Sequence, residues 1–278
     1  MKKWNMIVDV SRCNNCYNCF VATKDEYVGN EFEGYAAPQP LHGHAWVDIE
    51  RNESGQWPMV EAAFRPVMCN HCDDAPCVAA AKDNAVRKRY DGIVIIDPDK
   101  AKGQRQIVDA CPYGAVYWNE ELELPQAWPF DAHLLDHGWE KTKLEKVCPT
   151  EVFRSVKVTD EEMTEIAVDE DLKTLESKDG ARPRVYYKNS HRFDTGFIGG
   201  TIVTENDGSE DCVAGAAVVV SNGSGEIGCA RSDAFGEFKV SRLQENLGPV
   251  TVSIEFESSS RTIEVDFGQS IYIGTVSI

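Results

Sequence analysis

The chain has 278 residues, 42% of them hydrophobic, which is enough for a substantial core and for two domains of ordinary size. Its formal net charge of -18 argues against nucleic acid or an anionic membrane as a partner, and we expect a protein partner instead. The N-terminal sequence lacks the apolar segment of a secretory signal, and no apolar run approaches the roughly 20 residues that span a bilayer. We therefore expect a cytoplasmic chain, although a partner with an export signal could carry it across a membrane.

Residues 1–158 have the pattern of a loop-rich domain. Short strands are predicted over 4–10, 45–49 and 93–96, and a helix over 98–110. The lysines and arginines of the 51–56, 86–90 and 100–106 segments are interpreted as a solvated face, with contact to a partner or neutralisation of cluster charge as the alternatives. With so little regular structure, we expect this domain to need bound metal for its stability.

Eight of the ten cysteines lie in this domain, in a pattern that indicates metal binding. Two triplets, each one ligand short of four, are followed by two lone cysteines that both precede proline. In chain order these cysteines are Cys13, Cys16, Cys19, Cys69, Cys72, Cys77, Cys111 and Cys148. Close spacing favours a metal site over a disulfide framework. Three plus one, taken twice, predicts two sites with four thiolates each.

Iron–sulfur cubanes suit these triplets better than zinc does. Soft thiolates hold the iron of a 4Fe–4S cluster, and bacterial ferredoxins also place a Cys-Pro pair as a distant fourth ligand. Structural zinc sites more often use two pairs of ligands, so zinc is the competing interpretation. His71 lies inside the second triplet, and we expect it to form a hydrogen bond near a cluster sulfur rather than to bind iron.

Residues 159–195 are strongly acidic and are predicted to be a solvated helix or connector. From residue 196 to 278, short runs rich in Val, Ile, Ser and Thr alternate with turn residues, which predicts an all-β sandwich. Cys212 and Cys229 belong to this part. We expect free thiols in strands, with a disulfide as the alternative. We expect no catalytic site in the chain, because no nucleophile or acid–base pair stands out.

Several phrases resemble the iron–sulfur (beta) subunits of the dimethyl-sulfoxide-reductase superfamily of molybdopterin oxidoreductases. Within that family the chain is most similar to small subunits of the pyrogallol–phloroglucinol transhydroxylase group and of related catechol dehydroxylases and resorcinol hydroxylases. The resemblance covers nearly the whole chain. The phrases that carry it are VDVSRCNNCYNCF, RPVMCNHCDDAPCVA, DGIVIIDPDKAKG, CPYGAVYWNEE, AHLLD, RPRVYYKN and the C-terminal GTIV, GAAVVV and SDAFGEFKV.

This resemblance implies an α+β fold, with an interleaved bacterial-ferredoxin-like domain followed by a prealbumin-like sandwich that serves in docking. It also implies the ligand sets. The first set is Cys13, Cys16, Cys19 and Cys148; the second set is Cys69, Cys72, Cys77 and Cys111. Each set would hold one 4Fe–4S cluster.

The transhydroxylase group is expected to carry three clusters, and here four ligand positions depart together from that pattern. They fall on Thr23, Trp128, Asp131 and Leu144. In the interleaved scheme all four serve one cluster, so their joint replacement indicates that this cluster is absent. Asp131 is interpreted as a structural aspartate, and Trp128 and Phe130 are expected to fill the vacated volume.

The expected function is that of a non-catalytic electron-transfer subunit. Its partner would be a large catalytic subunit that alone carries molybdenum or tungsten with a pterin cofactor, in a heterodimer or higher assembly. Polyhydroxylated aromatics would be the substrates, in hydroxyl transfer, dehydroxylation or hydroxylation. The alternative is a structural or docking subunit whose clusters only stabilise the fold. A free ferredoxin fits poorly, because a carrier needs no sandwich domain.

Overall fold

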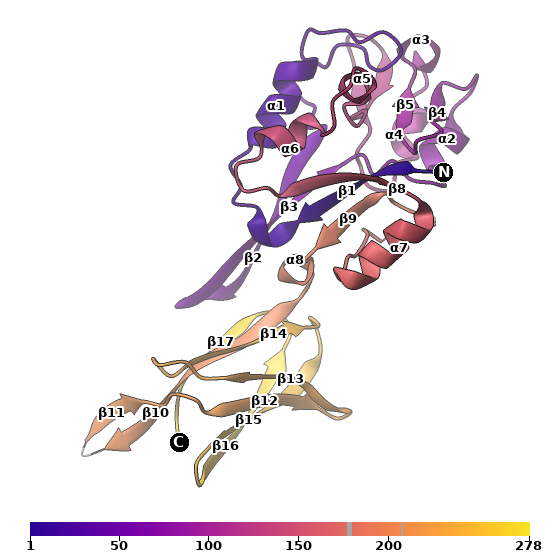
Figure 1. Cartoon of the computed structure of the whole chain (residues 1–278). Coiled ribbons are helices and arrows are strands. Elements are labelled where there is room, and N and C mark those ends of the chain that lie inside the picture. Colours follow the sequence, from indigo (N-terminus) through magenta and orange to yellow (C-terminus); the bar gives the residue numbers. More distant parts are fainter. Residues whose placement is uncertain (177–179, 207) are drawn as a thin grey trace. The chain divides into compact units, whose positions relative to one another are not determined.

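The computed structural model describes residues 1–176, 180–206 and 208–278 (Figure 1). Strands predominate and the helices are short. The strands are β1 (Lys3–Asp9), β2 (Val47–Gln56), β3 (Met59–Met68), β4 (Val86–Lys88), β5 (Val94–Ile96), β6 (Tyr117–Asn119), β7 (Leu124–Gln126), β8 (Phe153–Val158), β9 (Val185–Lys188), β10 (Gly196–Asn206), β11 (Ser209–Cys212), β12 (Ala217–Asn222), β13 (Gly225–Arg231), β14 (Glu237–Leu243), β15 (Gly248–Phe256), β16 (Ser259–Phe267) and β17 (Ile271–Ser277).

The helices lie mostly in the first two thirds of the chain. They are the 3-10 helix η1 (Val10–Arg12) and the α-helices α1 (Asn18–Tyr27), α2 (Pro76–Ala80), α3 (Pro98–Ala101), α4 (Gln106–Asp109), α5 (Ala132–Asp136), α6 (Lys143–Val147), α7 (Asp160–Asp169) and α8 (His191–Asp194). Among the described residues, none of these helices has the length and apolar character needed to cross a membrane.

The chain divides into two compact units. Unit 1 comprises Met1–Glu50 and Phe64–Ser190, and unit 2 comprises Arg51–Ala63 and His191–Ile278. The β2–β3 hairpin therefore contributes its outer part to unit 2, although the expected sandwich began at residue 196. The sequence does not show that the tip of the hairpin belongs to unit 2. Apolar and polar residues alternate along a hairpin in the same way whichever core its tip joins.

Unit 1 is organised around a three-stranded sheet in the order β8-β1-β9. β1 runs antiparallel to β8 and parallel to β9. Its apolar residues Met6, Ile7 and Val8 are almost fully buried. The strands predicted at 4–10, 45–49 and 93–96 correspond to β1, the start of β2, and β5.

The single helix predicted over 98–110 is wrong, because this segment forms two short helices, α3 and α4, that are separated by a turn. α3 begins after Asp97, whose carboxylate accepts hydrogen bonds from the backbone N–H groups of Asp99 and Lys100. The chain then leaves the helix at Lys102 and passes through Gly103 at a φ of 76°. A left-handed residue ends a helix, because the backbone can no longer continue the hydrogen-bond ladder.

The acidic segment predicted to be a connector forms part of unit 1. Its α7 begins with a capping box, in which Thr159 and Glu162 each accept a hydrogen bond from the other's backbone N–H. The buried side chain of Met163 packs with Ile7 and Leu172. The segment is thus an amphipathic helix with a narrow apolar stripe, which the surrounding carboxylates obscure in the sequence. Residues 177–179 of this segment lie outside the described residues.

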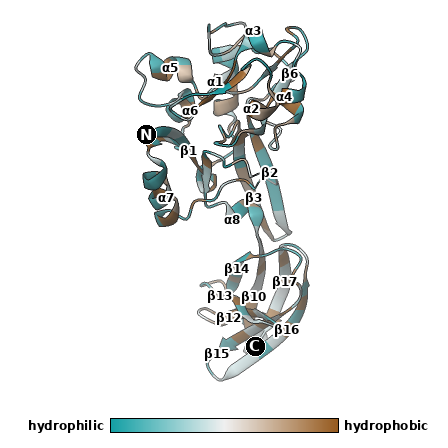
Figure 2. Ribbon diagram, turned by 90° about the vertical axis from the view of Figure 1, so that its right-hand side faces the viewer, coloured by the Kyte–Doolittle hydropathy of each residue, from teal (hydrophilic) through white to brown (hydrophobic). Residues whose placement is uncertain are grey.

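Unit 2 contains two sheets of four strands each. One has the order β11-β10-β14 with β17 pairing β10, and the other has the order β13-β12-β15-β16. Alternate side chains of their strands form one apolar core, and Figure 2 shows apolar and polar stretches interspersed along them. The core residues include Ile198, Val218, Val220, Phe238, Val240, Val252, Ile254 and Phe267. Cys212 and Cys229 are exposed free thiols in β11 and β13, which confirms the expectation for both.

Candidate iron–sulfur centre

The pairing of β1 with β8 determines where the first set of cysteines comes together. Val8 lies opposite Phe153 in this antiparallel pair. Cys13 follows Val8 by five residues, and Cys148 precedes Phe153 by five residues. Since the end of one antiparallel strand lies beside the start of its neighbour, two cysteines 135 positions apart arrive at the same end of the sheet.

Left-handed residues turn the first triplet back on itself. Asn15 and Tyr17, between the cysteines, have φ values of 61° and 59°. Cys19 then enters α1 and is buried. Cys19 is close enough to Cys13, Cys16 and Cys148 for each of these thiols to raise its pKa, although burial is the larger cause; the pKa of Cys19 reaches about 12.

The segment that carries Cys148 is attached to the segment that carries Cys13. Arg12 forms an ion pair with Glu151 at 3.1 Å. The backbone N–H of Asp9 also donates to the carbonyl of Val152, at 2.8 Å. The Cys148 sulfur itself accepts a hydrogen bond from the backbone N–H of Val152 at 3.3 Å. Such N–H donors stabilise a thiolate. When the thiolate is a cluster ligand, they also stabilise the reduced state of the cluster.

The second set of cysteines lines one cavity. Cys69 follows the end of β3, Cys77 lies in α2, and Cys111 follows α4. With Cys72, these residues surround about 320 Å³ of space not filled by atoms, part of it open to solvent. The remaining wall is mainly apolar and includes Val94 and Val116. The structure thus brings together all four cysteines of this set.

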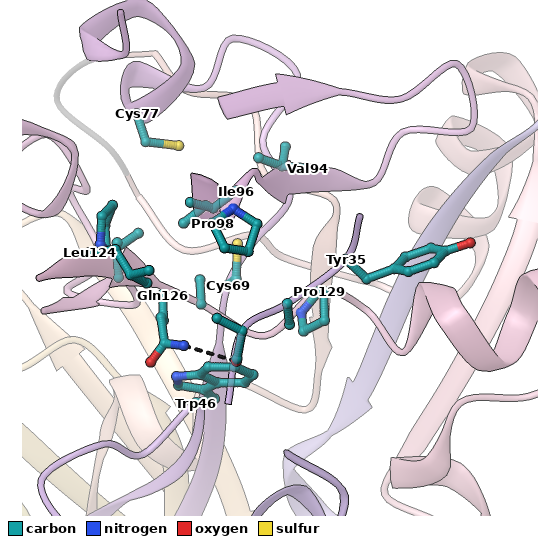
Figure 3. Close-up of a pocket in the computed structure, with 15 residues that line it drawn as sticks. Tyr35, Trp46, Cys69, Cys77, Val94, Ile96, Pro98, Leu124, Gln126 and Pro129 are labelled. Atoms are coloured by element: carbon teal, nitrogen blue, oxygen red, sulfur yellow. Dashed lines mark hydrogen bonds between the residues drawn. The ribbon is translucent and has the colours of Figure 1, made fainter. Parts of the chain in front are cut away.

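An apolar wall lies beyond this set. Cys69 and Cys77 also line a neighbouring cavity with Trp46, Ile96 and Leu124 (Figure 3). Gln126 closes one side by donating a hydrogen bond to the carbonyl of Ala37 at 2.9 Å. Apolar surroundings exclude water from the sulfurs, and solvent exclusion is one of the factors that tune the potential of a cluster.

A largely buried cationic network supports the second triplet. The Lys88 ammonium donates to the carbonyls of His71 and Cys72, at 3.0 and 2.7 Å, and forms an ion pair with Asp73 at 2.9 Å. Arg184 is only 3% exposed and binds the same aspartate at 2.7 Å. The prediction of a solvated face for residues 86–90 is therefore wrong at Lys88. Its ammonium group binds the carbonyls and the carboxylate of the loop that carries Cys72.

His71 carries a donor that the described residues leave unpaired. Its Nδ1 accepts a hydrogen bond from the backbone N–H of Val94 at 3.1 Å. Burial, with Lys88 as a lesser cause, lowers its pKa to about 3, so the ring is neutral and its proton lies on Nε2. That nitrogen is buried and has no hydrogen-bond partner in the described part of the chain. Since His71 lines the cavity of the second set, a cluster sulfur there would satisfy the Nε2–H donor.

Both sets have the chemistry that a cubane requires. Burial is the main cause that raises the pKa of Cys72 to about 12 and that of Cys77 to about 11. Thiolates at such positions are stable only beside a cation, which ligated iron supplies. Among residues 1–176, 180–206 and 208–278, no three His, Cys, Asp or Glu side chains are close enough to hold a single metal ion. A 4Fe–4S cubane does not require its ligands to lie that close together, because each cysteine binds a different iron atom.

The positions where four further cysteines are absent are filled by packed side chains. Thr23, Trp128, Asp131 and Leu144 are each at most 4% exposed. Asp131 accepts hydrogen bonds from the Tyr27 hydroxyl, the Trp128 indole and the backbone N–H of Lys143, at 2.9, 2.9 and 2.8 Å. Burial raises the pKa of this carboxyl, which the three donors oppose. The carboxylate of Asp131 therefore serves as a buried hydrogen-bond acceptor that joins three neighbouring groups.

Aromatic rings occupy the space beside Asp131. The rings of Trp128 and Phe130 have centroids 5.0 Å apart, and the ring of His71 contacts both edge-on. His133 hydrogen-bonds Glu26 at 2.8 Å, and Glu26 forms an ion pair with Lys143 at 2.7 Å. These contacts form a continuous network of packed and hydrogen-bonded side chains.

Comparison with known proteins agrees with this arrangement. The family model of a 4Fe–4S dicluster domain matches residues 60–158. The chain is 38% identical, over the full length of both proteins, to the pyrogallol hydroxytransferase small subunit of Pelobacter acidigallici. The chain belongs to this family of iron–sulfur small subunits.

Other members of the wider superfamily match part of the chain. A protein of Halobacterium salinarum that is named as an iron–sulfur subunit of a dimethyl sulfoxide reductase is 29% identical and aligns with 68% of this chain and 80% of its own length. The iron–sulfur subunit of an arsenate respiratory reductase of Shewanella is 29% identical over 48% of this chain and 52% of its own length. The resemblance stated from the motifs is therefore confirmed.

The supporting residues of the second triplet are what sequence reasoning missed. Lys88 and Arg184 lie 96 positions apart, and no local pattern shows that both contact Asp73. One available signal was the DD pair after Cys72, because carboxylates beside a thiolate site repel it unless cations neutralise them.

Replacing Lys88 by methionine tests the role of this network. Lys88→Met retains the apolar stem but removes a positive charge next to the second set, so addition of an electron becomes less favourable. We expect the midpoint potential of one cluster signal to fall by roughly 30–60 mV, which corresponds to a change of up to tenfold in electron affinity. An EPR-monitored redox titration measures it. The matched control is Lys82→Met, because Lys82 is exposed and its side chain has no partner among the described residues; an equal shift in both variants would contradict the assignment.

Proposed function

We propose that this chain carries two 4Fe–4S clusters and transfers single electrons for a larger oxidoreductase. The observation that supports this most strongly is the convergence of two separate four-cysteine sets in a chain of an iron–sulfur family. When bound, the clusters supply reversible one-electron storage. Cys13, Cys16, Cys19 and Cys148 hold one of them, and Cys69, Cys72, Cys77 and Cys111 hold the other, in the interleaved scheme of two ferredoxin-like halves.

The residues of the chain perform the remaining tasks. Lys88 and the Nε2–H of His71 favour the more negative, reduced state of the second cluster. The Val152 N–H does the same for the first cluster through Cys148. Apolar side chains such as Val94 and Val116 exclude water from the second site. The protein thus sets the potentials, while the iron carries the charge.

A third cluster is absent in this proposal, because the side chains at its four ligand positions are buried and engaged with one another. Asp131 uses both carboxylate oxygens to accept hydrogen bonds. Thr23 donates its hydroxyl to the carbonyl of Cys19 at 2.8 Å. Neither residue has the character of a ligand held ready for iron.

The partner is proposed to be a large catalytic subunit with a molybdenum or tungsten pterin cofactor. Support comes from the relatives, which are named as subunits of a pyrogallol hydroxytransferase, of arsenate respiratory reductase and of a dimethyl sulfoxide reductase. Full-length similarity to the first of these favours polyhydroxylated aromatics as the substrates of the complex. The prealbumin-like sandwich of unit 2 then serves in docking.

The filled third site favours one alternative, in which the clusters only stabilise the fold. Electron tunnelling needs closely spaced centres, and removal of one centre from a relay lengthens a step. In that case the chain would be a structural subunit. Its clusters would supply the stability that the loop-rich unit 1 does not gain from apolar packing.

Redox titration of the anaerobic complex separates these two functions. An electron-transfer subunit has two clusters that reduce and reoxidise reversibly, within the range of about -700 to +450 mV known for such centres. Substrate added to the oxidised complex, or a physiological acceptor added to the reduced complex, changes the spectrum of at least one cluster within the turnover time. Clusters that stay in one oxidation state throughout turnover would support the structural subunit and contradict electron transfer.

The structural role of Asp131 provides a second test. Asp131→Ala leaves the buried Tyr27 hydroxyl, the buried Trp128 indole and the partly buried N–H of Lys143 without their acceptor. At a penalty of about 1–3 kcal/mol for each unsatisfied group, this costs about 3 kcal/mol or more of unfolding free energy. Asp131→Asn is also destabilising, because its NH2 group takes the place of the oxygen that accepts the hydrogen bond from the Lys143 N–H. We expect thermal unfolding at a lower temperature with unchanged iron content per chain. The exposed Asp99→Ala is the control, and loss of about four irons in the Asp131 variants would instead identify Asp131 as a ligand.

A further inference from the structure

Unit 2 contains a polar cavity that the proposed electron transfer does not use. The cavity has a volume of about 150 Å³, well above the roughly 10–15 Å³ that one water molecule needs. Its lining comes from the β2–β3 hairpin, the α8 region and strands β10 and β14, all within unit 2. The polar and charged residues that line it are Glu61, His191, Arg192, Thr195, Lys239, Ser241 and Arg242.

The charge of this cavity is opposite to that of its surroundings. Residues 51–63 and 191–278 contain six Lys or Arg residues against fifteen Asp or Glu residues. Three of those six cations, Arg192, Lys239 and Arg242, line this one cavity, together with a single carboxylate. Glu61 is already bound by Lys239. A concentration of positive charge in an otherwise acidic unit attracts anions selectively, since the rest of the surface repels them.

A β-bulge forms the part of the cavity that contains Arg242. Gly196 lies opposite Leu243 and Ile198 lies opposite Val240, so Ser241 and Arg242 together face the single residue Phe197. Arg242 has a φ of 65°, in the left-handed region that side chains other than glycine rarely adopt. Bulges of this kind re-aim a side chain, and strained residues of this kind often lie at ligand sites.

Arg242 lacks the partner that its neighbours have. Lys239 is half-buried and pairs with Glu61, whereas the exposed Arg242 has neither a hydrogen bond nor an ion pair within residues 1–176, 180–206 and 208–278. Ser241, which lines the same cavity, is also exposed, and its hydroxyl has no hydrogen bond to that part of the chain. A planar guanidinium and an adjacent hydroxyl are the donors that bind carboxylate or phosphate oxygens.

We propose that this cavity is a binding site for a small multivalent oxyanion, a phosphate or a dicarboxylate, with Arg242 and Ser241 as its principal donors. Arg192 and Lys239 add attraction from the same cavity. The site lies in the part of the chain without cluster ligands, so it is independent of the proposed electron transfer. An acidic side chain of a partner protein has the same chemistry, and the experiment distinguishes it from a free anion.

Calorimetric titration of the intact complex with inorganic phosphate, and separately with malonate, tests this proposal at constant ionic strength. We expect saturable binding of one anion per chain in the wild type, and at least tenfold weaker binding in Arg242→Gln and in Ser241→Ala. Arg261→Gln is the matched control, because Arg261 is an exposed arginine of β16 that does not line the cavity. Circular dichroism and iron content verify that each variant is folded.

Three results would overturn the proposal. One is the absence of saturable binding of either anion to the complex. Another is equal weakening in the Arg261 control, which would indicate general attraction to positive charge. The third is binding to the isolated full chain that disappears in the complex, which would show that a side chain of the partner occupies the cavity. Cluster content and reduction are unaffected by any of these, so the test is separate from that of electron transfer.

Discussion

If unit 1 holds the two proposed clusters, one constraint governs its fold: four cysteines from distant parts of the chain must meet at each of two points. Loops rather than long elements build this unit, and its longest helices, α1 and α7, have ten residues each. One apolar cluster of this unit, with Val86, Val94 and Ile107, includes Cys72 and Cys77 themselves. Under the proposed function, cluster binding contributes directly to folding, because each cluster links segments that are distant in the chain.

The rest of unit 1 serves this convergence. Antiparallel pairing of β1 and β8 brings Cys13 and Cys148 to one end of a sheet. Left-handed residues, Asn15 and Tyr17 in the first triplet and His71 in the second, curve the loops around their sulfurs. Cations that a surface would expose are instead directed at loop carbonyls, as Lys88 is. In the proposed function, the same contacts that hold a loop in place also influence the charge state of its cluster.

The sequence predicted the chemistry of unit 1 better than its architecture. Cysteine spacing indicates four-ligand sites because ligation is local within each triplet, but the pairing with Cys111 or Cys148 came from the resemblance and not from spacing. Several features depended on tertiary contacts that no local pattern contains. The acidic helix α7 packs through Met163, Gly103 divides a predicted helix, and the hairpin tip at residues 51–63 joins the core of unit 2. The strands of unit 2 were predictable, because their alternation of apolar and polar residues reflects the packing of two sheets on one core.

Two clusters, and not three, are proposed to occupy this chain. Iron and acid-labile sulfide, measured per chain on anaerobically purified full-length protein, test it most directly. We expect about eight of each, four for each cubane, with two distinct EPR signals on reduction. About twelve would contradict it, because the network around Asp131 and Trp128 would then have to open to accept iron, and about four would show that one of the two cysteine sets is not a cluster site.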